Sequence, residues 1–232
     1  MKKFVFTCLL LCTSATVFSQ AAIIALIFGD KVATENFNIG LEIGGSFKNV
    51  SNLEGSNMFL GMNFGISGNI KFNDHWSLHP TAYFLSQKGG KLDRFSLMTD
   101  NPELNSEFQN VPTELKLDYI DVPVVLNYRF TNSNFKIGLG PMVSFLTKSH
   151  AVYENQFGKF DHNISQWTHK TEWSAMFNVG YIYYSKKKQK EIHFLVQYVH
   201  GFSDVYRDVL FSGDNRNHYF GMTLSFPFIK KD

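Results

Sequence analysis

Hydrophobic and other residues alternate along two runs near the middle of the chain, LDYIDVPVVLNYRF (117–130) and FKIGLGPMVSFL (135–146), which are joined by the turn-forming residues TNSN. Successive side chains of a β-strand point to opposite faces, so the pattern predicts an antiparallel hairpin with one apolar face. The apolar face of the first run comprises Ile120, Val122, Val124, Leu126, Tyr128 and Phe130. Its opposite face comprises Tyr119, Asp121, Pro123, Asn127 and Arg129. Both strands exceed the usual ~5 to 6 residues and are long enough to cross a lipid bilayer at a tilt.

The same alternation recurs in six further segments, which gives eight strands, an even number as closure of an antiparallel barrel requires. These segments are residues 37–47, 58–71, 76–87, 171–185, 191–204 and 217–229. Short connections at 72–75, 131–134 and 186–190 alternate with longer ones at 48–57, 88–116, 149–170 and 205–216. Short turns belong on the periplasmic side and long loops outside. We therefore expect an all-β fold, an eight-stranded antiparallel transmembrane β-barrel with both termini in the periplasm.

The direction of the apolar face separates a membrane barrel from a soluble, ligand-carrying barrel, which would show the same alternation. The opposite faces of the expected strands carry mostly Gly, Asn, Ser and Thr, with Tyr interspersed, rather than the Lys and Glu of a water-facing surface. Small neutral side chains suit the crowded lumen of an eight-stranded barrel. A charge-free apolar face suits lipid, where a mid-plane Lys or Arg costs about 2 to 4 kcal/mol. We predict a location in the outer membrane, in contact with its lipid.

Aromatic residues gather at the short-turn ends of the expected strands and predict a girdle at one membrane interface. They are Phe72, Trp76, Tyr128, Phe130, Phe135, Tyr183, Tyr184, Phe226 and Phe228. The composition of 24 Phe, 10 Tyr and 17 Gly also fits a barrel with aromatic girdles and a crowded lumen.

The N-terminus has the pattern of a secretory signal peptide. Lys2 and Lys3 precede an apolar run from Phe4 to Cys12, and Val17 and Ser19 supply small residues for cleavage before Gln20. Lipid attachment at Cys12 is the alternative, which Leu11 disfavours because a small residue is needed there. We expect three parts: a signal peptide (1–19), an N-terminal periplasmic segment (20–36) and the barrel domain (37–232).

Charge and cysteine content limit the partners and chemistry of the mature chain. Removing Lys2 and Lys3 leaves 20 basic and 20 acidic residues, so no bulk charge attracts nucleic acid. Both cysteines, Cys8 and Cys12, fall within the expected signal peptide, so we expect no disulfide or cysteine metal site.

A few charged residues fall on the face that points into the lumen, where charges must pair or reach water at a mouth. They are Glu42, Asp121, Arg129 and Lys136, with Lys71 and Glu191 as further candidates. We interpret Glu42, Asp121, Arg129 and Lys136 as a structural polar network that fills the lumen; a proton or ion path is the alternative.

The run LDYIDVPVVLNYRF resembles the PorT-type outer-membrane β-barrel family of Bacteroidetes-like Gram-negative bacteria, in which a strand similar to YLEIPVLLKY recurs. Tyr119, Ile120, Pro123 and Tyr128 match this strand, while Asp121 replaces the commoner Glu. The following strand also resembles that of the family, with Gly138, Gly140 and Pro141 at its core, whereas IKKD after Phe228 departs from an aromatic C-terminal residue. The resemblance covers nearly the whole mature chain. It implies an eight-stranded barrel and, from the namesake member, a link to the type IX secretion apparatus.

The long connections carry residue types that could support chemistry. Residues 149–170 contain His150, Glu154, Asp161, His162, Ser165 and His169, the types used in acid-base or Ser-His catalysis, but no HExxH spacing. Residues 88–116 contain Asp93, Asp100, Glu103, Glu107 and Glu114, without the spacing of a calcium loop. We therefore assign no catalytic, cofactor-binding or metal-binding residue and expect no cofactor.

Three functions are compatible with these observations. We favour a non-enzymatic barrel with a structural or interaction role at the cell envelope, accessory to protein secretion through envelope or secretion-complex proteins. The alternatives are an outer-membrane hydrolase or acyltransferase that uses His and Asp residues of 149–170, and a narrow gated channel.

Overall fold

The computed structural model describes residues 33–53, 56–185 and 190–228. The expected signal peptide, nearly all of the expected periplasmic segment and residues 186–189 of the expected connection 186–190 lie outside the described residues. The division into three parts therefore stays a prediction.

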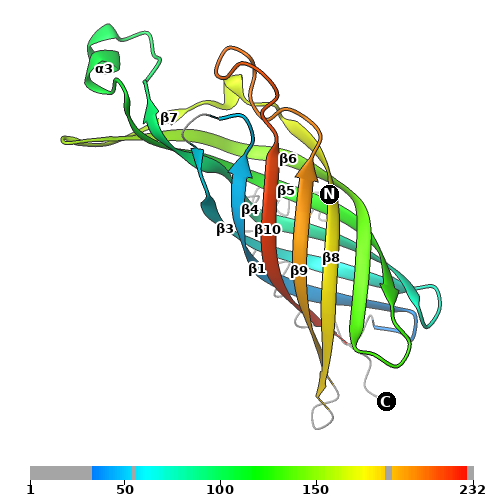
Figure 1. The fold of residues 1–232 in the computed structure, drawn as a ribbon. Helices are drawn as coiled ribbons and strands as arrows, with labels where there is room; N and C mark the ends of the chain where they lie inside the picture. The colour runs from blue at the N-terminus through cyan, green and yellow to red at the C-terminus, as the bar shows by residue number, and fades with distance from the viewer. Residues whose placement is uncertain (1–32, 54–55, 186–189, 229–232) are drawn as a thin grey trace, which may run out of the picture.

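Eight long antiparallel strands form a closed barrel in which every strand pairs with its neighbours in the chain (Figure 1). They are β1 (Phe37–Val50), β3 (Phe59–Lys71), β4 (Trp76–Phe95), β5 (Val111–Arg129), β6 (Phe135–Asn155), β8 (Thr171–Ser185), β9 (Lys190–Gly201) and β10 (Asn217–Pro227). Pairing of β1 with β10 closes the ring, with Gly40 opposite Pro227 and Val50 opposite Asn217. The predicted fold class is confirmed, and short turns at the periplasmic end alternate with longer external connections.

Four smaller elements lie at the external end. They are β2 (Ser56–Asn57), α3 (Pro102–Glu107), β7 (Gly158–Asn163) and the 3-10 helix η1 (Ser165–Trp167). The side chain of Asn101 caps α3 by accepting hydrogen bonds from the backbone N–H groups of Glu103 and Leu104. None of the helices in the described ranges is both long and apolar enough to span a membrane.

Two predicted loops are wrong in extent because the strands continue beyond the expected membrane boundary. In the predicted loop 88–116, β4 runs on to Phe95 and β5 already begins at Val111, so only 96–110 connects them. In the predicted loop 149–170, β6 continues to Asn155 and turns back as β7. Figure 1 shows these extended strands projecting past the others at one end of the barrel. The alternation persists here because one face packs against other external residues, so strand length does not report membrane thickness alone.

A β-bulge in β4 reverses which residues face the lumen. Tyr83 pairs with Asp121 and Ser86 pairs with Tyr119, so β4 contains one residue more than β5 between these pairs. Inward positions change from odd numbers, as at Tyr83, to even numbers, as at Ser86 and Lys88. Plain alternation along 76–87 would place Gln87 inward, but the bulge leaves Gln87 half-buried and Lys88 only 1% exposed.

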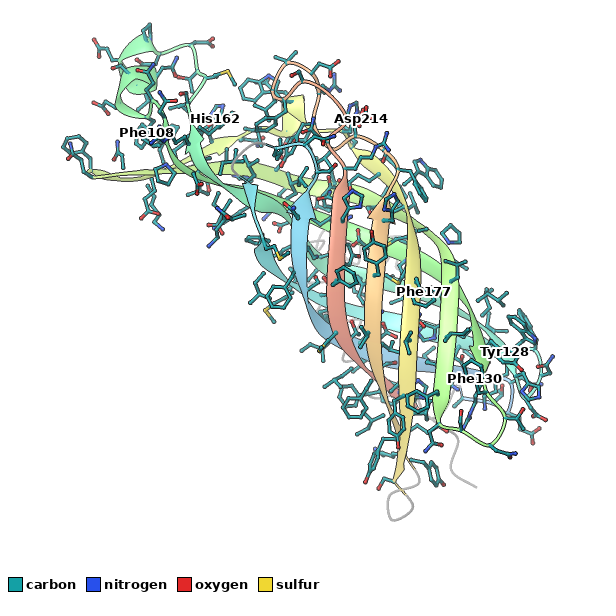
Figure 2. All side chains as sticks on the ribbon, in the orientation of Figure 1. Phe108, Tyr128, Phe130, His162, Phe177 and Asp214 are labelled. Atoms are coloured by element: carbon teal, nitrogen blue, oxygen red, sulfur yellow. The ribbon has the colours of Figure 1, made fainter. Side chains whose placement is uncertain are left out.

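The outer face of the barrel is apolar over a band that matches a bilayer. From Phe135 to Phe145 in β6, and from Trp173 to Tyr183 in β8, the outward positions carry no charged residue. Each span contains about 11 residues, within the ~9 to 11 that a tilted transmembrane strand needs. Phe177 projects outward in the middle of this band, and Tyr128 and Phe130 lie at its periplasmic end (Figure 2). Beyond the band, strands carry exposed charged residues such as Lys148, so those parts are in water.

The external ends of the strands enclose an apolar cluster, which we call the external cap. Its buried members are Val50, Leu53, Leu92, Leu97, Phe108, Leu115, Leu117, Tyr119, Ala151, Tyr153, Ile164, Val205, Tyr206 and Leu210. They come from β1, β4, β5, β6 and the connections between strands, so the cap ties the external connections to the barrel. Burial, reinforced by the negative charge of Glu172, raises the pKa of Tyr206 in the β9–β10 connection, so this phenol stays neutral.

Candidate functional site

The four charged residues predicted to line the lumen do so at different depths and do not form one network. Glu42 and Asp121 are buried within the barrel, on β1 and β5. Lys136 is also buried, near the periplasmic mouth, and Arg129 is half-buried at that mouth. The lumen instead contains two clusters, in which each predicted acid meets residues outside the predicted set of four.

The upper cluster is centred on Lys88 of β4. Its Nζ lies 3.1 Å from Asp121 Oδ1 and 3.2 Å from Glu172 Oε2, and it donates a hydrogen bond of 2.8 Å to Ser144. The ammonium also lies 4.3 Å from the ring centroid of Tyr119. One cation buried between two carboxylates and a π-face is well compensated for its loss of water.

Hydrogen bonds extend the upper cluster to the opposite walls. Ser86 donates to Asp121 Oδ2 at 2.6 Å, and Lys48 of β1 donates to Ser86 at 3.3 Å and to Asn63 at 3.0 Å. Across the lumen, the amide of Asn217 donates to both oxygens of Glu172 at 2.9 Å. The cluster thus connects β1, β3, β4, β5, β6, β8 and β10 through side chains.

The lower cluster is centred on Glu42. His79 Nε2 lies 2.7 Å from Glu42 Oε1, and the hydroxyl of Tyr83 donates to Glu42 Oε2. Gln197 donates to the Tyr83 oxygen at 3.3 Å and accepts from Thr223 at 2.9 Å. Both carboxylate oxygens of Glu42 therefore contact side chains of β4.

A cavity of about 380 Å³ opens at the periplasmic mouth. In its wall, Lys136 Nζ donates to His193 Nδ1 at 3.1 Å, and His193 Nε2 lies 3.0 Å from Glu191 Oε2. Since Nδ1 accepts from the ammonium, Nε2 carries the proton and donates to Glu191. Lys71 and Arg129 also line this cavity.

Sequence reasoning missed Lys48, Lys88 and Glu172, which carry much of the charge in the upper cluster. Lys88 and Lys48 fell in expected loops, because the extension of the strands past the bilayer has no distinct sequence signal. Glu172 fell inside an expected strand, and its spacing of two from Ser174 placed it on the inward face. That spacing was a usable signal.

The external residues considered for catalysis come together only in part. His150 Nδ1 lies 2.6 Å from Asp161 Oδ1 on the β6–β7 hairpin, in an exposed position. His162 instead packs against Phe160 and Trp167, and Figure 2 shows it at the external end. Among the described residues, no hydrogen bond joins Ser165 or His169 to the His150–Asp161 pair. No group of three or more possible metal ligands occurs in the described ranges.

Comparison with known proteins gives one family and several solved structures. The family model for an outer membrane protein beta-barrel domain matches residues 18–207. Among solved structures, the chain is similar to Ail, the attachment invasion locus protein of Yersinia pestis, at 14% identity and a TM-score of 0.42, covering 84% of this chain and 100% of that chain. It is also similar to Neisserial surface protein A (12% identity, TM-score 0.41, 82% and 96% covered) and to OprG from Pseudomonas aeruginosa (14%, 0.43, 83% and 93%). No significant match is found among curated proteins.

We expect Asp121→Asn to destabilise the barrel, because Lys88 then keeps only Glu172 as a buried counter-ion. Removing one partner of a buried pair predicts a loss of about 3 kcal/mol in the free energy of unfolding. Urea unfolding of the detergent-folded protein, followed by Trp fluorescence, measures it. The matched control is Glu114→Gln, which removes a carboxylate 3.2 Å from the exposed Lys116 and should cost about 1 kcal/mol or less. Equal unfolding midpoints for the two variants would contradict a stabilising role of the upper cluster.

Proposed function

Because this chain belongs to the family of outer membrane protein β-barrel domains, and lies in the outer membrane, we propose that it is a non-enzymatic barrel with a structural and interaction role at the cell envelope. The observation that carries the proposal is the filled lumen. Two side-chain clusters occupy it at successive depths, and the external cap packs above them. Lipid covers the outer band, so the parts left for contacts are the external extension and the periplasmic mouth.

We further propose a PorT-like role, accessory to protein secretion. The resemblance of the strand around Asp121 to that family supports it. The extended β4–β7 region offers a partner a surface outside the membrane, and Phe157 at the tip of the β6–β7 hairpin is 80% exposed. The periplasmic turn between β5 and β6 offers a second surface.

Site-specific photo-crosslinking in intact cells tests this role. A photoreactive residue is placed at Asn132 in the β5–β6 turn, at Phe157 in the external hairpin, or at Phe177, which faces lipid. We expect protein adducts at Asn132 or Phe157 that contain components of the secretion apparatus, with Phe177 as the lipid-facing control. Adducts without any such component, or none at Asn132 and Phe157, would contradict the secretion role.

The hydrolase alternative is favoured by one observation, the short contact between His150 and Asp161. A catalytic His–Asp pair would make activity depend on both side chains. We expect alanine replacement of His150, Asp161, His162 and His169 to leave lipid composition and proteolysis at the envelope unchanged. A change in either that follows the His150 and Asp161 replacements would support an enzyme instead.

The channel alternative makes a different prediction. Because buried ion pairs fill the lumen and the external cap closes its outer end, we expect no stable conductance from the purified barrel in planar bilayers. A large porin inserted in the same bilayer is the positive control. Reproducible conductance steps from this protein would favour a gated channel over a closed barrel.

A further inference from the structure

The cavity at the periplasmic mouth has the character of a ligand site. We call it the periplasmic cup and define its deep wall by Asn38, Asn127, Arg129, Lys136 and His193. Its volume of about 380 Å³ lies within the ~300 to 1,000 Å³ typical of small-ligand pockets. Strands from all around the barrel contribute to its lining, so its shape is fixed by the barrel.

Two glycines leave room for the polar side chains of the deep wall. A Cβ atom at Gly138 would lie 2.2 Å from Asn127 Oδ1, and a Cβ at Gly180 would lie 2.9 Å from Lys136 Cε. Any larger residue would displace Asn127 or Lys136. Glycine at these positions therefore leaves both side chains the space that they occupy along the wall.

The deep wall contains polar groups without partners. Asn127 is 2% exposed, and neither its amide nitrogen nor its oxygen has a hydrogen-bond partner among the described residues. A buried amide without partners costs free energy that a ligand can recover. Arg129 of the deep wall and Lys71 beside it form no ion pair in the same described ranges, although the charges of both attract the carboxylate of Glu191.

The acids near the deep wall are already engaged. Both oxygens of Glu42 are bound by His79 and Tyr83, and Glu191 accepts from His193. Glu35 and Asp74 also line the cup. Taken together, the lining has three Lys or Arg residues and three acidic residues, a balance that suits a single negative charge better than a multiply charged phosphate.

We infer that the periplasmic cup binds a carboxylate group, for which the free C-terminal end of a short peptide is the probe. The planar guanidinium of Arg129 can donate two parallel hydrogen bonds to a carboxylate, and the Asn127 amide can donate another. Lys136 adds positive charge beside them. This inference goes beyond the proposed interaction role and holds whether or not the barrel serves a secretion complex.

Fluorescence anisotropy with the full chain folded in detergent tests the inference. The probes are a labelled Gly-Ser hexapeptide with a free C-terminal carboxylate and the same peptide with a C-terminal amide. We expect the carboxylate form to bind about tenfold or more tightly than the amide, as charge-assisted hydrogen bonds predict. Arg129→Gln should abolish this difference. Lys148→Gln is the control: it removes one positive charge at the external end of the β5–β6 hairpin and should preserve the preference for the carboxylate form.

A mobility shift between unheated and boiled samples in detergent gels confirms that each variant is folded. If Arg129→Gln does not fold, Asn127→Ser replaces it, and we expect the preference for the carboxylate form to fall with this variant as well. Equal binding of the two peptides, or binding of neither by the folded protein, overturns the inference. So does an equal loss of preference in Arg129→Gln and Lys148→Gln. The binding assay measures neither secretion nor crosslinking, so its result is independent of the secretion proposal.

Discussion

The buried ion pairs of Lys88 constrain the register of the strands that supply their partners. A fully buried ammonium is tolerated only when nearby groups replace its water, and Lys88 has two carboxylates, a hydroxyl and an aromatic face around it. Those groups come from β5, β6 and β8, so the charge is compensated only when strands distant in sequence reach their final register. The bulge in β4 is part of the same requirement, because it turns Lys88 inward.

The barrel separates its polar and apolar chemistry by depth as well as by face. The outward band is free of charge where lipid lies, while the lumen behind it holds the two clusters. Towards the outside, the lumen becomes apolar and is closed by the external cap. Towards the periplasm, it opens into a polar cup with Asn127 at its wall. This asymmetry makes the periplasmic end the place where a solute can reach the interior, which sets the scaffold apart from an open pore.

The alternation of residues predicted the fold class and the number of membrane strands, because lipid outside and a narrow lumen inside impose a strict two-residue period. The bulge was not predictable from the sequence. Phe84 and Leu85 are consecutive apolar residues, so the pattern fits a strand with an extra residue at this point as well as one without it. The external extension was missed because packing in the cap, as at Leu115 and Leu117, continues the same period in water. Individual inward charges such as Asp121 could be named from their strand, but their partners could not. Lys88 contacts Asp121 and Glu172 because of the register between strands, and a single sequence does not specify that register.

The bulge also limits how the gene for this protein can vary. Loss of one codon at Phe84 or Leu85 would remove the extra residue of the bulge and leave plain alternation through the rest of β4, with Ser86 and Lys88 still facing the lumen. A one-codon insertion after Leu85 would instead turn Lys88 towards lipid and Gln87 into the lumen, and so change the environment of the whole outer half of the strand. The connection at 96–110 has no alternation to maintain, so insertions among related genes should accumulate there and be absent from the seven residues before Gly90. In β4, which side chains face the lumen depends on the number of residues before them as much as on their identity.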